Sequence, residues 1–166
     1  MKTKLKSSLS KAILVFLMVF SNLSLASAQE YDAMKGVDSV NVIFDMRDGI
    51  PMIANVHMKL IHHTYNELMA MNKKPVFVVV FMGSAIRLIS SNRTGFSSEE
   101  HKYLDEMAAT ISKMSKAGIK LEVCLAAVDY FGIEPASIQS GIEHVGNGWI
   151  SEIDYQAKGY KLVPVY

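Results

Sequence analysis

The run from Val76 to Met82, Val-Phe-Val-Val-Val-Phe-Met, has no polar residue at any of its positions. Successive side chains of a β-strand point to opposite faces of a sheet, so a strand without polar positions must be covered on both faces. Sheets with both faces covered are mostly parallel sheets between layers of helices. The run therefore predicts the centre of a parallel sheet, with Pro75 before it and Gly83-Ser84 after it.

Segments of strand and helix character alternate around this central run. Apolar residues recur near every 3.6 positions from Met52 to Met71 and from Ser98 to Ala117, which is typical of amphipathic helices. The full order is β-α-β-α-β-α-β-α-β, with strands at 40–44, 76–82, 119–123, 142–145 and 160–165, and helices at 52–71, 98–117, 125–130 and 149–157. Such alternation requires right-handed crossovers. It predicts an α/β three-layer sandwich with a five-stranded, mainly parallel sheet.

The first 28 residues have the three parts of a secretory signal peptide. Four lysines precede the apolar stretch Ala12 to Leu25, and the small residues Ala26-Ser27-Ala28 follow it. A retained membrane anchor is the alternative, but a span needs about 20 apolar residues, and this stretch is shorter and interrupted by polar residues. We expect cleavage after Ala28, a periplasmic or otherwise exported protein, and no stable membrane association afterwards.

The remaining chain is long enough for one domain at 38–166, preceded by a flexible amino-terminal arm at 29–37. Cleavage would remove four lysines and no acid, so the formal charge would fall from +1 to −3, which gives no attraction for nucleic acid. No glycine-rich nucleotide motif or G-x-S-x-G motif occurs. His57, His62 and His63 lack the i, i+4 spacing of zinc-binding helices. We expect no cofactor and no metal.

Candidate site residues gather where the strands end, because ligands of open α/β sheets bind beyond the carboxyl ends of the strands. Cys124, the only cysteine, lies between a strand and a helix, where backbone N–H groups and the helix dipole favour a thiolate. Gly83 and Ser84 could donate hydrogen bonds, Arg47 (or Arg87) could supply positive charge, and His144 could act as a base. Ordinary structural roles, as a strand-ending glycine or solvated arginines, are equally compatible with these positions.

The whole segment from Val40 to Val165 also resembles the DsrE/DsrF-like family of sulfur-relay proteins. The likeness is carried by Val79 to Leu88, Glu122 to Ala127, and Gly141 to Trp149 with Gln156 to Tyr160 beyond it. The resemblance implies a flavodoxin-like sheet, assembly into trimers or hexamers, a protein that donates or accepts sulfur, and a strand-end cysteine that carries sulfur as a persulfide. Only Cys124 matches that cysteine. The relay proteins work in the cytoplasm, whereas this chain is predicted to be exported.

Two hypotheses follow. In the first, the chain is an exported sulfur-handling protein with Cys124 as a persulfide carrier. In the second, it is a non-catalytic oligomeric α/β module that binds a small ligand or a protein, and Cys124 is a packing residue, because cysteine is among the residues most often buried.

Overall fold

The computed structural model describes residues 31–166. The predicted signal peptide, residues 1–28, lies outside the described residues. Of the predicted arm at 29–37, the structure describes 31–37, where Asp32–Met34 form a 3₁₀ turn and Met34 packs against the core. No helix within 31–166 combines the length and the apolar character that crossing a membrane requires.

The centre of the fold is a five-stranded sheet in which every pairing is parallel. Its strands are β1 (Ser39–Met46), β2 (Lys74–Phe81), β3 (Lys120–Cys124), β4 (Glu143–Val145) and β5 (Lys161–Val165), in the order β4-β3-β2-β1-β5. The apolar run 76–82 supplies β2, which lies in the middle of the sheet. The predicted α/β class and the central place of this run are confirmed.

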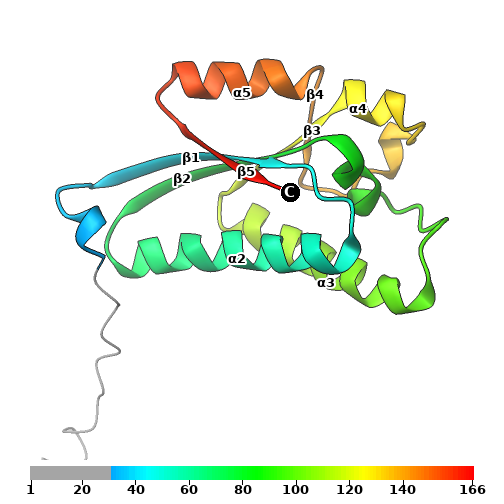
Figure 1. Cartoon of the computed structure of the whole chain (residues 1–166), viewed down its shortest axis with the longest axis horizontal. Coiled ribbons are helices and arrows are strands. Elements are labelled where there is room, and N and C mark those ends of the chain that lie inside the picture. Colours follow the sequence, from blue (N-terminus) through cyan, green and yellow to red (C-terminus); the bar gives the residue numbers. More distant parts are fainter. Residues whose placement is uncertain (1–30) are drawn as a thin grey trace, which may run out of the picture.

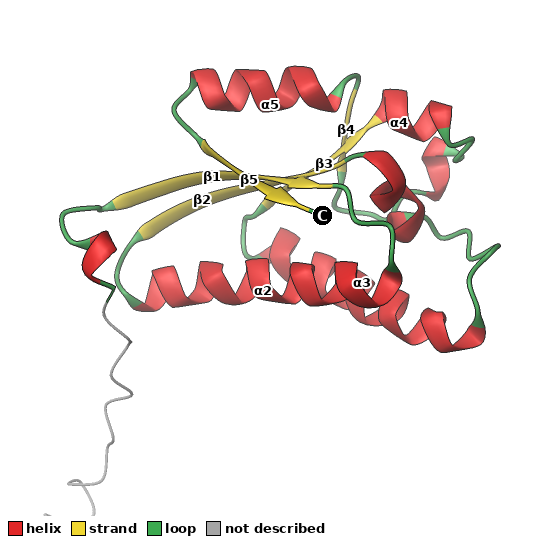
Figure 2. Cartoon of the chain, in the orientation of Figure 1, coloured by secondary structure: helices red, strands yellow, loops and turns green. Residues whose placement is uncertain are grey.

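Helices cover both faces of the sheet, so the fold has three layers (Figure 1). Helices α2 (Pro51–Ala70) and α3 (Ser98–Lys116) pack together on one face, and α5 (Gly148–Ala157) lies on the other. The short helix α4 (Leu125–Tyr130) follows β3 directly, and a 3₁₀ helix, Gly83–Ile89, follows β2 (Figure 2). Helix α5 carries the chain back across the sheet from β4 at one edge to β5 at the other.

Local sequence explains where the long helices begin and end. Pro51 occupies the first turn of α2, where its missing N–H costs no hydrogen bond. Ser97 and Glu100 form a capping box at the start of α3, in which the backbone N–H of Ser97 donates to Glu100 Oε2 at 2.7 Å. Lys113 and Lys116 lie in its last turn, where positive charge complements the helix dipole.

The two faces of the sheet bury different kinds of side chain. The face toward α2 and α3 carries the larger apolar core, including Phe44, Met46, Phe81 and Val123. The opposite face has a smaller apolar cluster, formed by Ile43, Val78, Val80, Met82 and Cys124. Because side chains alternate along a strand, Asp45 and Glu122 also point to this second face, and both are buried. Ionisable groups are therefore buried beneath α5, beside the predicted cysteine.

Candidate functional site

A cavity of about 310 Å³ lies at the carboxyl edge of the sheet. It is bounded by the segments that follow β1, β2 and β3 together with the start of α5, as expected for ligand sites of open parallel sheets. Apolar and aromatic side chains make most of its wall. The lining residues are Arg47, Met82, Gly83, Cys124, Ala126, Ala127, Tyr130, Phe131, Asn147 and Trp149.

Cys124 is the last residue of β3 and the N-cap of α4, and it lines the cavity. The residue is only 5% exposed, and among the described residues its thiol makes no capping hydrogen bond. The backbone N–H of Ala126, one of the donors at the start of α4, is already bound to the carbonyl of Gly146 at 3.2 Å. A Cβ on Gly148 would lie 3.0 Å from the Cβ of Cys124, so glycine lets α5 start against the cysteine.

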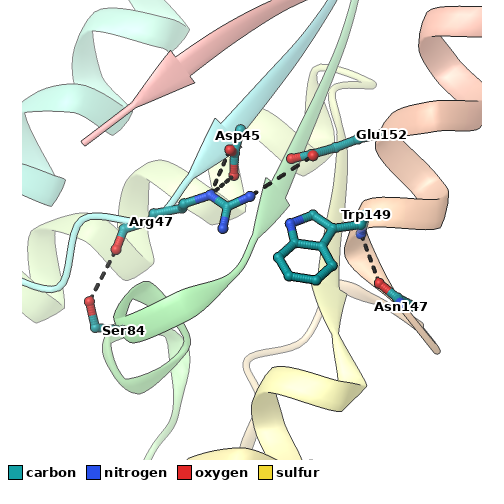
Figure 3. A network of polar contacts seen from close by, with 6 residues as sticks. All are labelled: Asp45, Arg47, Ser84, Asn147, Trp149 and Glu152. Carbon is teal, nitrogen blue, oxygen red and sulfur yellow. Dashed lines mark hydrogen bonds and ion pairs between the residues drawn. The ribbon is translucent and has the colours of Figure 1, made fainter.

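Arg47 brings a fixed positive charge to the same cavity. Its Nε donates to both oxygens of Asp45, at 2.6 and 2.8 Å, and its Nη2 lies 4.0 Å from Glu152 Oε2 (Figure 3). Its guanidinium carbon is 5.9 Å from the centre of the Trp149 ring. Asp45 therefore holds the guanidinium through Nε, which leaves the terminal nitrogens for other partners.

Glu152 reaches this cluster from α5 and is 7% exposed. Burial, and then the neighbouring charge of Asp45, raise the pKa of Glu152 to about 7, although Arg47 acts in the opposite direction. Its Oε1 is buried and has no hydrogen-bond partner within residues 31–166. Near neutral pH this carboxyl group is thus close to half protonated and can both accept and donate a hydrogen bond.

The structure brings three of the predicted residues together and separates the others from the cavity. Cys124, Arg47 and Gly83 line it, and Gly83 has a φ of +55°, which glycine adopts readily. Ser84 lies behind the wall, where its Oγ donates to the carbonyl of Arg47 at 3.1 Å. His144 is exposed on the edge strand β4 and is not among the lining residues.

Sequence reasoning missed several groups at this site. Asp45 lies one residue beyond the predicted strand 40–44 but belongs to β1, where it is buried. Nothing in the local pattern of α5 marks Glu152 as buried. Trp149 and Asn147 were part of a distinctive segment without an assigned role. The backbone N–H of Trp149 donates to Asn147 Oδ1 at 3.0 Å and thereby caps α5 (Figure 3). Trp149 itself lines the cavity.

A second buried network fixes α5 to β3. Glu122 is 2% exposed, and its carboxylate accepts from Tyr155 Oη at 2.9 Å and from Ser151 Oγ, while Lys120 Nζ lies 3.0 Å away. The partnership with Glu122 raises the pKa of Lys120. Burial raises the pKa of Tyr155. This carboxylate has partners on both oxygens, so the network is better suited to holding α5 than to chemistry.

No cluster of three or more metal-ligating side chains occurs in the described part of the chain. The three histidines that lack the spacing of a zinc-binding helix, His57, His62 and His63, lie on α2. His57 Nδ1 lies 3.5 Å from Asp48 Oδ2, and His63 Nε2 lies 3.5 Å from Glu67 Oε1.

Comparison with known proteins connects this architecture to a family. A protein of Aquifex aeolicus (strain VF5), described as "Uncharacterized protein", is 22% identical to this chain over 126 residues. The match covers 75% of this chain and 56% of that protein, so this chain spans little more than half the length of that relative. Two solved structures share the fold. MTH1491 of Methanobacterium thermoautotrophicum has a TM-score of 0.54 and 15% identity, covering 76% of this chain and 97% of that one. BT1422 of Bacteroides thetaiotaomicron has a TM-score of 0.55 and 17% identity, covering 77% and 95%.

Both are described as proteins of unknown function, and at these identities they show the fold alone. The assignment comes from the sequence of this chain. Residues 53–165, which run from α2 to the end of β5, match the model of one family, and the chain belongs to the DsrE/DsrF-like family.

Proposed function

We propose that the protein handles sulfane sulfur and that Cys124 carries it as a persulfide. The thiolate of Cys124 attacks the sulfane sulfur of a donor, the bond between that sulfur and the rest of the donor breaks, and the leaving group takes the electron pair. An acceptor thiolate then attacks the outer sulfur and releases the thiolate of Cys124. Such exchange depends on the thiolate fraction and on access to the sulfur.

The observation that carries the proposal is the position of the only thiol in the chain. Cys124 lies at the carboxyl edge of the sheet, in the wall of a 310 Å³ cavity that Arg47 also lines. A cavity of this size has room for several atoms beyond the thiol, since one water occupies about 30 Å³.

Mass spectrometry tests the proposal directly. The purified protein is incubated with polysulfide, and the intact mass is measured before and after treatment with a reductant. We expect a gain of one sulfur atom that the reductant removes and that Cys124→Ser abolishes. A protein with a free thiol that gains no sulfur under these conditions would contradict the proposal.

The second hypothesis, a binding module with a structural cysteine, also has support. Cys124 is 5% exposed and belongs to an apolar cluster with Ile43, Val78, Val80 and Met82. If the thiol only packs, iodoacetamide will modify Cys124 no faster than the protein unfolds, and Cys124→Ala will leave ligand binding unchanged. If the cavity gives access to the sulfur, modification will occur in the native state.

We further propose that copies of the chain associate, as trimers or hexamers. Helix α5 turns its acidic Glu152 toward the sheet, whereas Ile150 and Ile153 are both 65% exposed. Such exposed apolar side chains on one helix are typical of an interaction surface. Light scattering coupled to size exclusion measures the assembly directly. Ile153→Asp, on the outward side of α5, should reduce the assembled mass, and an unchanged mass would exclude this surface.

Export remains a proposal based on the sequence. Expression of the full chain in a bacterial host, followed by fractionation and amino-terminal sequencing, tests it. We expect a periplasmic product that begins at Gln29, whereas a cytoplasmic product that begins at Met1 would refute export.

A further inference from the structure

We propose that the cavity beside Cys124 binds a small organic anion, with an apolar body against its aromatic wall and an anionic end on Arg47. The proposed function gives this ligand a chemical class: resting on that function, the anion is an organic thiosulfonate that donates its outer sulfur to Cys124. The binding itself needs only the cavity and the arginine.

The size and the wall of the cavity favour an organic ligand over a simple inorganic ion. Sites for small organic molecules usually enclose 300–1,000 Å³ and have mainly apolar walls with a few placed polar groups. This cavity measures about 310 Å³, and Met82, Phe131 and Trp149 supply its apolar surface. Tyr130 and Trp149 are 84% and 59% exposed, so aromatic surface remains available to a ligand at the rim.

The charge of the ligand follows from the arrangement around Arg47. Asp45 binds Nε only, so the paired terminal nitrogens that recognise oxyanions are not consumed by it. Glu152 lies 4.0 Å from Nη2, too far for a hydrogen bond. Glu152 is also partly neutralised near pH 7, because burial raises its pKa to about 7. An entering anion therefore meets the guanidinium of Arg47. Of the two carboxyl groups beside this guanidinium, Glu152 is only partly ionised near pH 7.

The transfer step balances in atoms and charge. The thiolate of Cys124 attacks the outer sulfur of an arenethiosulfonate, Ar–SO₂–S⁻, and a new S–S bond forms. The bond between the two donor sulfurs breaks, and its electron pair leaves with the arenesulfinate, Ar–SO₂⁻. The products are the Cys124 persulfide and the sulfinate. No oxidant, reductant or proton is required, and Arg47 would stabilise the sulfinate oxygens as the leaving group forms.

Equilibrium binding to the Cys124→Ser protein tests the cavity without any transfer. Trp149 is the only tryptophan in the chain and lines the cavity, so intrinsic fluorescence reports this site. The probe is benzenesulfonate, an unreactive analogue of benzenethiosulfonate, and calorimetry is run in parallel. We expect saturable binding and an affinity at least ten times weaker for the neutral analogue benzenesulfonamide, because a charge-assisted pair is lost.

Three variants in the Cys124→Ser background locate the site. Arg47→Gln should weaken benzenesulfonate binding at least tenfold. Ala126→Leu, which fills the mouth from an exposed position, should weaken it without touching Arg47. Arg93→Gln is the matched control: Arg93 also pairs with an aspartate, Asp105, at 3.0 Å, but does not line the cavity, and its loss should leave the affinity unchanged.

The outcomes separate the two proposals. No saturable binding, equal affinity for the neutral analogue, or unchanged affinity in both Arg47→Gln and Ala126→Leu would overturn the organic-anion site. If benzenesulfonate binds as expected but the wild-type protein gains no sulfur from benzenethiosulfonate or polysulfide, the sulfur function fails and the anion site stands. If polysulfide loads Cys124 while benzenesulfonate does not bind, the sulfur function stands and this inference fails.

Discussion

Replacing Glu152 by glutamine should change how the stability of the protein depends on pH. Glu152 is 7% exposed, and its pKa rises from the usual 4.5 to about 7 on folding. The folded protein therefore holds this proton more tightly than the unfolded chain does. Below pH 4.5 the group is protonated in both states, and its contribution to stability is fully present. Between pH 4.5 and 7 the unfolded chain releases the proton first, so the contribution of Glu152 to the free energy of unfolding falls as pH rises.

The size of the effect follows from the two pKa values. Each unit of difference corresponds to about 1.4 kcal/mol, so this carboxyl group destabilises the fold by about 3 kcal/mol at pH 8 relative to pH 4. Glutamine keeps the shape and hydrogen-bonding capacity of the protonated acid and does not titrate. Glu152→Gln should match the wild type near pH 4 and exceed its stability by about 3 kcal/mol at pH 8.

Urea unfolding followed by far-ultraviolet circular dichroism, at pH values from 4 to 8, measures this difference. The comparison between variant and wild type removes the contribution of Glu100 and Glu106, whose lowered pKa values make stability fall at acid pH in both proteins. Glu134→Gln, at an exposed carboxyl group, is the control, and its free energy of unfolding should depend on pH in the same way as that of the wild type. A constant difference between Glu152→Gln and the wild type at all pH values would refute the reasoning.

Three further variants test the groups around the site. Tyr155→Phe removes the hydroxyl that donates to buried Glu122 at 2.9 Å and should cost about 1–3 kcal/mol in urea unfolding. Lys120→Met should lower the free energy of unfolding by about 2 kcal/mol, because it leaves Glu122 without its cation. Removing the exposed ion pair between Lys158 and Asp154 should lower it by under about 1 kcal/mol. Gly148→Ala should slow alkylation of native Cys124, since the new Cβ would meet Met82 Sδ, and a faster reaction would contradict this. Gly146→Ala is its control, because a Cβ there would meet no atom of residues 31–166 within 4 Å.

The layered fold could be predicted because its determinants are local and periodic. The apolar run 76–82 identified the central strand β2, and helical spacing identified α2 and α3. The strand order, with β5 beside β1, was not predictable from such patterns. The strand order depends on α5 crossing the face of the sheet opposite to α2 and α3. Which face α5 crosses is determined by packing between segments that are distant in the sequence.

The candidate site was predicted only in outline, for a similar reason. Positions at strand ends pointed to one edge of the sheet, because the carboxyl ends of parallel strands share an edge, and Cys124, Gly83 and Arg47 line one cavity there. Glu152 could not be found this way. In the sequence, α5 shows Trp149, Ile150 and Ile153 as its apolar side, which would ordinarily face the core. The structure instead turns Glu152 inward, toward Asp45 and Arg47, and leaves these three apolar side chains exposed.

The limited exposure of Cys124 constrains how a sulfur carrier of this design would work. With the residue 5% exposed, a donor must reach the thiol through the cavity and must therefore be small. A persulfide extends the side chain by one S–S bond of about 2 Å, so the outer sulfur would stand further into the cavity than the thiol does. Loading would then select small molecules, whereas unloading could serve a bulkier thiol. Alkylating reagents of increasing size test this asymmetry: the largest reagent that reacts with the persulfide should exceed the largest that reacts with the native thiol, and equal limits would contradict it.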